Sequence, residues 1–388
     1  MASDAPLAVD PGAPTRPSLP VGVHRFHRQR FIDYQLQRLY SEGYVPLDEV
    51  RNAAAEIESI ADHPQVLARL SDRAEAQGRL RAAAFYARAA EFFVPPESPQ
   101  RRAAYERFVA RFDRAFADEG LTRTLVPYRG GHLPVLRVPA RGVPRATVLA
   151  FGGFDSLIEE FYGVWATLAH AGFEVLAFEG PGQGGARAVH GLTFEHDWER
   201  PVAAILDHFG LDDVALVGMS MGGYWALRAA AYEPRISRVV AWPPVYDWLV
   251  QVPRIGRPLV RWMARRRSFM RWSIGVRMRL APILRHVVAQ TLYIQGSQDR
   301  ADVADWFLGM NATHLGSQRI TQDVLLMVGE DDGFQPPRLA RAQAAALTHA
   351  RSVTTRSFTA EEEASRHCQM GNLGLATSVV AQWLTSVS

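Results

Sequence analysis

The sequence predicts an α/β protein, with a doubly wound, mostly parallel β-sheet flanked by helices. Five apolar runs without polar alternation occur after residue 146, as expected of strands that are buried on both faces of a parallel sheet. Helical patterns separate these runs, which is the order that doubly wound sheets require. The chain before residue 118 instead has helical periodicity and few strand signals. We therefore expect a helical domain in front of the sheet.

Size and composition narrow the class of protein. The chain has 388 residues, of which 48% are apolar and 21% are charged, enough for a core domain with one accessory region. The net charge is only +3, so we expect no nucleic-acid partner. No apolar run approaches the roughly 18 residues of a transmembrane helix, and we expect no membrane partner. The single cysteine, Cys368, excludes an internal disulfide and fits a cytoplasmic location.

The N-terminal region is expected to form a leader and a helical domain. Residues 1–21 are predicted to be a flexible leader, because the first twenty contain five prolines and lack the basic start and apolar centre of a secretory signal. Residues 22–118 are predicted to be helical. The segment 79–93 has apolar residues at helical spacing, three prolines follow it, and a second amphipathic helix runs from Tyr105 to Phe116.

The sheet is expected to come from two parts of the chain, residues 119–242 and residues 323–388. The first part opens with a β-hairpin, in which TRTLVPY and HLPVLRV flank Gly130 and Gly131. Strands and helices then alternate, as in doubly wound folds. The predicted strands after the hairpin are 147–151, 174–178, 214–218, 238–242, 324–329 and 352–358.

Residues 243–322 separate two predicted strands by far more than one helix and its loops, and we predict an inserted helical lid there. The alternative for TLYIQG, residues 291–296, is a further strand. The aromatic and apolar side chains of the lid are expected either to line a hydrophobic pocket or to pack the lid against the helical domain. These residues are Trp248, Trp262, Phe269, Met270 and Trp272.

The lid is also rich in arginine. Between Asp247 and Asp299 there is no acidic residue, but there are ten arginines. Such a stretch is expected either to receive an acidic carrier protein or an anionic substrate, or to be a solvated face whose arginines pair with acids elsewhere.

The strongest chemical signal is Gly218-Met-Ser-Met-Gly222, which directly follows the predicted strand VALVG and precedes a predicted helix. A serine at such a strand-to-helix turn is held in a crowded backbone conformation that requires small neighbours, and its hydroxyl projects above the sheet. We therefore predict that Ser220 is a nucleophile in an α/β-hydrolase fold, in which an inserted lid is expected at residues 243–322.

A serine nucleophile needs a base, and the base needs an orienting acid. In this fold the acid and then the histidine follow the serine along the chain. The loop after the strand VLLMVG supplies Asp331 and Asp332, of which we prefer Asp332 and keep Asp331 as the alternative. His367 follows the last predicted strand and is the best-placed base, whereas His349 lies in a helix before that strand.

Acyl transfer also needs hydrogen-bond donors for the oxyanion. The backbone N–H of Met221, directly after the nucleophile, is one expected donor. The other is expected from Gly153 or Phe154, in the glycine-containing loop that follows the strand TVLAF. A plain glycine turn is the alternative for that loop.

The segments FGGFDSLIEEFY, FEGPGQGG, GMSMGGYWALRAA, GEDDGFQPP and SRHCQMGN together resemble the α/β hydrolases that carry an N-terminal helical domain, and RAAAFYARAAEFF resembles that domain. This family includes 2,6-dihydroxypseudooxynicotine hydrolase, fermentation-respiration-switch esterase-like proteins and fungal hydrolases that shorten polyketide chains. The resemblance covers roughly residues 79–388.

The resemblance implies cleavage of a carbon–carbon bond next to a ketone, or of an ester, with Ser220 as nucleophile, Asp332 as orienting acid and His367 as base. It implies a small-molecule acyl or ketone substrate and no metal or organic cofactor. It also implies that the helical domain covers the active site and takes part in a homodimer. Two other functions stay open: a thioesterase, cyclase or acyltransferase of polyketide metabolism that acts on a carrier-bound chain, and a ligand-binding scaffold without activity.

Overall fold

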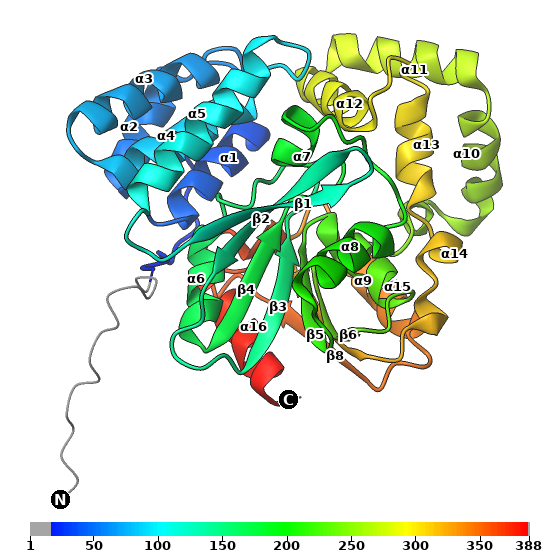
Figure 1. Ribbon diagram of the computed structural model, residues 1–388. Helices are drawn as coiled ribbons and strands as arrows, with labels where there is room; N and C mark the ends of the chain where they lie inside the picture. The colour runs from blue at the N-terminus through cyan, green and yellow to red at the C-terminus, as the bar shows by residue number, and fades with distance from the viewer. Residues whose placement is uncertain (1–16, 387–388) are drawn as a thin grey trace, which may run out of the picture.

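The computed structural model describes residues 17–386, which form a central β-sheet with helices on both faces and two helical regions beside the same edge (Figure 1). Residues 1–16 of the predicted leader lie outside the described residues. Residues 17–21 have no regular secondary structure, but Leu19 packs against the core. The amide of Gly22 then donates to the carbonyl oxygen of Gly371 at 2.8 Å, so this segment runs along the body of the protein.

The N-terminal region is helical, as its periodicity predicts. Helix α4 is rich in buried alanines, whose small side chains let α3 and α5 pack closely on either side of it. Prolines at positions 95, 96 and 99 follow α4 and precede the next helix. The five helices are α1 (Arg30–Ser41), α2 (Leu47–Glu56), α3 (His63–Ala76), α4 (Leu80–Phe92) and α5 (Gln100–Ala115).

The sheet has eight strands in the order β1-β2-β4-β3-β5-β6-β7-β8. Strand β2 pairs antiparallel with β1 and β4, and the other neighbours are parallel. The strands are β1 (Thr122–Tyr128), β2 (Gly131–Val138), β3 (Ala146–Phe151), β4 (Phe173–Phe178), β5 (Val214–Met219), β6 (Ile236–Trp242), β7 (Asp323–Gly329) and β8 (Ser352–Phe358). The structure thus confirms the mostly parallel sheet of the α/β-hydrolase fold.

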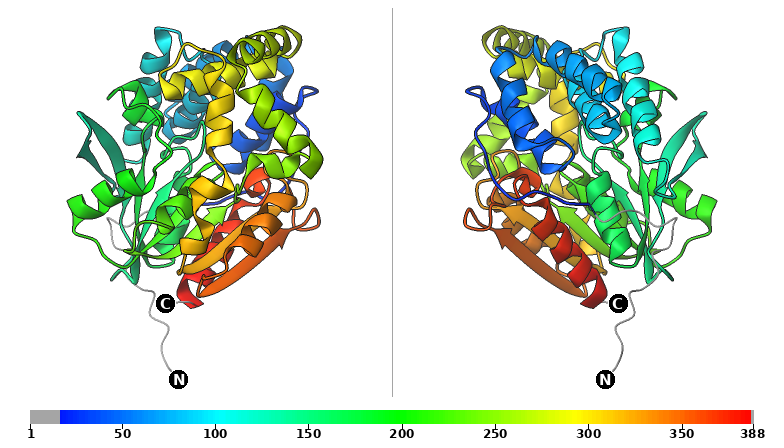
Figure 2. Two further views of the ribbon diagram at one scale, coloured as in Figure 1. Left: turned by 90° about the vertical axis from the view of Figure 1, so that its right-hand side faces the viewer. Right: turned by 90° about the vertical axis from the view of Figure 1, so that its left-hand side faces the viewer.

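Helices cover both faces of this sheet (Figure 2). Helices α6 (Tyr162–His170) and α16 (Leu373–Ser386) pack on one face, in a core that is continuous with the N-terminal helices. The other face is covered by α8 (Glu199–Phe209), α9 (Gly222–Ala230) and α15 (Pro337–Ala346). Because the parallel strands end at one edge, the loops after β3, β5, β7 and β8 meet there.

The segment 243–322 contains helices and no strand, and all of it is described. TLYIQG lies in the last turns of a helix, so the strand alternative is wrong. No helix among residues 17–386 combines the length and apolar character needed to cross a bilayer. The helical elements of this lid are η1 (Trp248–Gln251), η2 (Arg254–Gly256), α10 (Arg257–Ala264), α11 (Arg267–Leu280), α12 (Pro282–Gln295), α13 (Asp302–Gly309), α14 (Ala312–Leu315) and η3 (Ser317–Arg319).

Buried ion pairs join the N-terminal helices to the loop after β3. Arg38 of α1 contacts Asp155 at 3.3 Å and Glu160 at 2.5 Å. Arg88 of α4 contacts Glu160 at 3.0 Å, pairs with Glu91, and donates to the carbonyl oxygen of Asp155 at 2.6 Å. Both arginines are almost fully buried. The helical domain therefore fixes the position of a loop at the carboxyl edge of the sheet.

Replacing Arg88 by methionine is expected to lower the free energy of unfolding by about 3–5 kcal/mol, because Glu91 and Glu160 would each lose a buried partner. Urea unfolding measures the change. The control is Arg69→Met, which removes a half-exposed ion pair with Glu56 and is expected to cost at most about 1 kcal/mol. Equal losses in the two variants would contradict the importance of the buried network.

Candidate active site

Ser220 lies in a sharp turn between β5 and α9, with a φ of 55°. This left-handed conformation is strained for a residue with a side chain. The turn has no room for larger neighbours: a Cβ on Gly218 would lie 2.0 Å from the carbonyl oxygen of Gly222, and one on Gly222 would lie 2.7 Å from that of Gly152. The amide of Ser220 donates to the carbonyl oxygen of Trp242 at 2.6 Å, which anchors the turn to β6.

The structure brings Ser220, His367 and Asp332 together in one chain of hydrogen bonds. The Oγ of Ser220 lies 2.9 Å from Nε2 of His367, and Nδ1 of His367 lies 2.7 Å from Oδ2 of Asp332. The other carboxylate oxygen of Asp332 accepts from the amides of Phe334 at 2.8 Å and Gln335 at 2.7 Å. Asp332 is 3% exposed. Its carboxylate is thus held so that Nε2 of the imidazole faces the serine.

The two aspartates after β7 have different surroundings. Asp332 is buried against His367, whereas the neighbouring Asp331 is exposed. The amide of Asp331 donates to the carbonyl oxygen of Ser365 at 2.9 Å. Asp332 is therefore the carboxylate that contacts the imidazole, and Asp331 is not.

The Asp332 carboxylate changes the acidity of the histidine. Burial alone lowers the pKa of His367, but the neighbouring Asp332 carboxylate and the Cys368 thiol outweigh burial and hold the pKa of His367 well above its ordinary value. Cys368 itself is buried, and its Sγ lies 3.7 Å from the carbonyl oxygen of Trp242. The imidazole therefore binds a proton more tightly than a free histidine.

The expected oxyanion donors lie beside the serine. Gly153 packs against the turn so closely that a Cβ would lie 2.8 Å from both the amide nitrogen of Met221 and Cβ of Ser220. The amide of Gly153 already donates to Oγ of Ser156 at 3.1 Å. That bond favours Phe154 over Gly153 as the donor from this loop.

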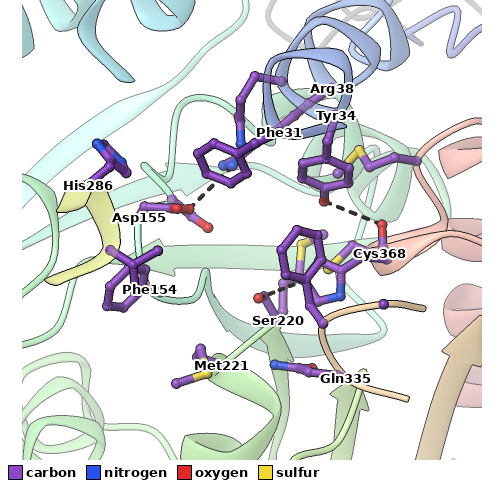
Figure 3. Close-up of a pocket in the computed structure, with 18 of the residues that line it drawn as sticks. Phe31, Tyr34, Arg38, Phe154, Asp155, Ser220, Met221, His286, Gln335 and Cys368 are labelled. Carbon is purple, nitrogen blue, oxygen red and sulfur yellow. Dashed lines mark hydrogen bonds and ion pairs between the residues drawn. The ribbon is translucent and has the colours of Figure 1, made fainter. Parts of the chain in front are cut away.

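The amide of Met221 also has a partner close by. Gln335 is buried beside it, with its amide oriented so that Nε2 donates to the carbonyl oxygen of Pro243 at 3.1 Å and Oε1 accepts from Met221 at 3.2 Å. Figure 3 shows Gln335 and Met221 on the same side of the pocket. A substrate oxygen that accepts from Met221 has to displace or share this Gln335 contact.

A cavity of about 310 Å³ lies over Ser220. Its walls come from the sheet edge, from the lid and from α1 of the helical domain, which overhangs the serine in Figure 3. Most of the wall is aromatic or apolar, and the Arg38–Asp155 ion pair and His286 are polar exceptions. The aromatic wall residues are Phe31, Tyr34, Phe154, Phe161, Trp248, Phe307 and Phe334.

A second cavity, of about 720 Å³, adjoins the first. Phe31, Tyr34, Phe334 and His367 line both cavities, so they form the boundary between them. The second cavity has a more polar wall, which includes Asp331.

The resemblance implies that the helical domain covers the active site, but sequence reasoning named none of the residues of that domain that line the cavity. Tyr34 and Arg38 come from α1, and the hydroxyl of Tyr34 donates to the carbonyl oxygen of His367 at 3.5 Å (Figure 3). No local pattern in the sequence distinguishes α1 from the other N-terminal helices as the one that lines the cavity. Gln335, in contrast, lies within the motif that supplied Asp332 and could have been considered on that ground.

The lid aromatics have separate locations. Trp248 lines the cavity, and Met270 packs within the lid. Trp262, Phe269 and Trp272 are exposed. For these three, both expectations are wrong: they neither line a pocket nor pack the lid against the helical domain. Among the described residues, no group of three or more His, Cys, Asp or Glu side chains is arranged to hold a metal ion.

Comparisons of the sequence with known proteins identify a family for the chain. A family model described as serine aminopeptidase, S33, matches residues 142–359. Hydrolase acrC of Aspergillus aculeatus is 34% identical over 269 residues, which cover 60% of this chain and 62% of acrC. Alpha/beta hydrolase psoB of Aspergillus fumigatus is 33% identical over 273 residues, which cover 56% of this chain and 59% of psoB. The chain thus spans about 60% of the length of these curated relatives.

Solved structures share the whole fold. The 2,6-dihydroxy-pseudo-oxynicotine hydrolase matches with a TM-score of 0.62 at 19% identity, covering 91% of this chain and 95% of that one. AbyA5 matches with a TM-score of 0.67 at 20% identity, covering 88% and 91%. Together with the family model, these matches confirm the resemblance drawn from the motifs.

Proposed function

The chain belongs to the α/β-hydrolase family described as serine aminopeptidase, S33, and we propose that it is a serine hydrolase of aromatic or polyketide-like small molecules. The bond cleaved is a carbon–carbon bond next to a ketone, or a carboxylic ester. The observation that carries the proposal is the hydrogen-bonded chain of Ser220, His367 and Asp332 at the wall of a mostly apolar cavity.

In the proposed reaction, Oγ of Ser220 attacks the substrate carbonyl while Nε2 of His367 accepts the hydroxyl proton. Asp332 stabilises the imidazolium that forms. The tetrahedral oxyanion accepts hydrogen bonds from the amides of Met221 and Phe154. Collapse of this intermediate breaks the bond to the leaving group and leaves an acyl group on Ser220.

The leaving group takes the proton from His367. In an ester the leaving atom is the alkoxide oxygen, and in a β-diketone or acyl-phenol it is a carbanion that the second carbonyl or the ring stabilises. Water then attacks the acyl-enzyme, with His367 as general base, and releases the acid and free Ser220. The net reaction adds one water molecule across the cleaved bond.

The cavity supports a compact, largely apolar acyl or aryl group as the part of the substrate nearest the serine. Its volume of about 310 Å³ is at the lower end of the range of about 300–1,000 Å³ for small-molecule sites. Its aromatic wall offers flat surfaces for stacking, and the part-buried Arg38–Asp155 pair offers a fixed polar contact on one side.

The decisive experiment combines covalent labelling with product analysis. A fluorophosphonate probe is expected to label Ser220, with the modified peptide identified by mass spectrometry. Simple aryl esters and aromatic β-diketones are then compared as substrates, and product masses distinguish ester from carbon–carbon cleavage. Failure of the probe to label Ser220, together with no turnover of either class, would contradict the proposal.

The pH dependence of kcat/KM follows from the state of His367, which has to be neutral to accept the serine proton. Because Asp332 and Cys368 raise its pKa, the reactive form accumulates only above that raised value. We expect kcat/KM for an uncharged aryl ester to rise with pH through an apparent pKa above the ordinary histidine value of about 6.5. A rising limb centred below 6.5 would contradict this assignment.

A further inference from the structure

The outer surface of the lid carries large apolar side chains that nothing in the described chain covers. They lie on η2, α10 and α11 at the periphery of the molecule in Figure 1, and their exposed fractions run from 40% at Phe269 to 93% at Ile255. We call this surface the lid ridge and define it by Ile255, Leu259, Trp262, Phe269, Trp272 and Leu280.

Helix α11 has two apolar faces, and only one is used inside the protein. Met270, Ile274 and Met278 recur every four residues and pack into a small cluster within the lid. Phe269 and Trp272 belong to a different stripe of the helix, which is exposed. An exposed apolar surface of this kind marks a binding site for a partner or a membrane.

The charges around the lid ridge are almost all positive. Of the ten arginines between Asp247 and Asp299, Arg267 and Arg271 pair with acidic residues, namely those at positions 299, 302 and 305. Within residues 17–386, no ion pair is found for the other eight. These arginines are Arg254, Arg257, Arg261, Arg265, Arg266, Arg277, Arg279 and Arg285. The expected pairing with acids elsewhere in the chain is therefore found for Arg267 and Arg271 and, among the described residues, is not found for the other eight.

A partner that binds the lid ridge therefore has to be both negatively charged and apolar. A second copy of this chain is a poor fit, because a symmetric contact would bring unpaired arginines against arginines. Neither of the two cavities described above takes a wall residue from α10 or α11. Exposed tryptophan and leucine beside arginine suit the interface of a bilayer, which needs no complementary shape.

We propose that the lid ridge docks on an anionic lipid surface, with its apolar side chains in the interfacial layer and its arginines against the headgroups. This proposal departs from the expectation of no membrane partner, which rested on the lack of an apolar run long enough to span a bilayer. Helix α12, which follows the lid ridge directly, supplies Ile283 to the second cavity and His286 to the first. Docking would therefore place lipid close to the elements that enclose the serine.

Vesicle binding tests the proposal with the full chain. Wild-type protein is sedimented with vesicles of phosphatidylcholine containing phosphatidylglycerol, or with phosphatidylcholine alone. We expect at least about tenfold stronger binding to the anionic vesicles, weakening as salt is raised. Brominated lipids are expected to quench the emission of Trp262 and Trp272, because both are exposed on the lid ridge whereas the indoles of Trp165 and Trp225 are buried.

Matched variants separate the lid ridge from general effects. Trp272→Ser, and Arg265→Ser combined with Arg277→Ser, are each expected to reduce binding to anionic vesicles by about tenfold or more. The controls are Val143→Ser and Arg73→Ser, which change exposed residues elsewhere and are expected to bind like wild type. All variants should keep wild-type hydrolysis of a soluble aryl ester.

Three results would overturn the proposal. They are no vesicle binding, binding that is equal for neutral and anionic vesicles, and binding that the lid-ridge substitutions leave unchanged. If acyl carrier protein, an acidic protein, instead binds the lid ridge and vesicles do not, the occupant is a protein and not a lipid surface. Ser220→Ala should bind vesicles like wild type, so failure of the hydrolase proposal is distinguishable from failure of this one.

Discussion

Replacing Ser220 by alanine is expected to reduce kcat by about 10⁶-fold, because the variant lacks the only oxygen that lies within hydrogen-bond distance of Nε2 of His367 among the described residues. What remains is catalysis by the cavity and the oxyanion donors. The cavity wall is otherwise unchanged, so substrate affinity is expected to stay close to that of wild type. Steady-state kinetics and equilibrium binding of the same substrate measure the two effects separately.

The control for this substitution is Ser156→Ala. Ser156 lines the same cavity, but its hydroxyl contacts the amide of Gly153 and not the imidazole. We expect kcat to fall by about tenfold, which corresponds to the loss of one hydrogen bond. This loss is far smaller than that for Ser220→Ala. Full turnover by Ser220→Ala would remove the basis of the proposed mechanism.

Replacing Asp332 by asparagine is expected to reduce kcat by about 10⁴-fold, because an amide can donate to Nδ1 of His367 and favour the tautomer that no longer accepts the serine proton. The imidazolium also loses its counter-charge. The measurement is kcat for an aryl ester, with circular dichroism to establish that the variant is folded.

Asp331→Asn is a close control, since it makes the same chemical change one residue earlier. Asp331 is exposed and has no contact with the imidazole, so kcat is expected to stay within about threefold of wild type. If Asp331→Asn were the more damaging of the two, Asp331 and not Asp332 would be the orienting acid.

Most of the fold could be predicted because the signals are local. The strands β3 to β7 are apolar runs, and the helices between them have their own periodicity; of the strands after the hairpin, only the mostly polar edge strand β8 lacks this signal. The hairpin is indicated by two glycines between β-rich segments. TLYIQG was ambiguous for a physical reason: short apolar runs occur both in buried strands and in helices, and α12 extends through this one.

The site could be predicted in part. The position of Ser220 follows from the requirement for glycine on both sides of a crowded turn, and His367 follows from chain order. The choice between Asp331 and Asp332 depends on which carboxylate the loop directs inwards. Position favours Asp332, the third residue after Gly329, but residue type is the same for both and leaves Asp331 as the alternative. The residues of α1 that line the cavity were not predictable one by one, because their place there joins segments far apart in the chain.

By itself the sequence determined the mostly parallel sheet, the two helical regions and the nucleophile turn, since hydrophobic periodicity and glycine sterics act over a few residues. Only the tertiary structure decided between Asp332, which the sequence favoured, and Asp331. It also decided which residues of α1 line the cavity and that Trp262 and Trp272 are exposed. Those outcomes depend on how distant elements pack, and packing is set by the whole chain.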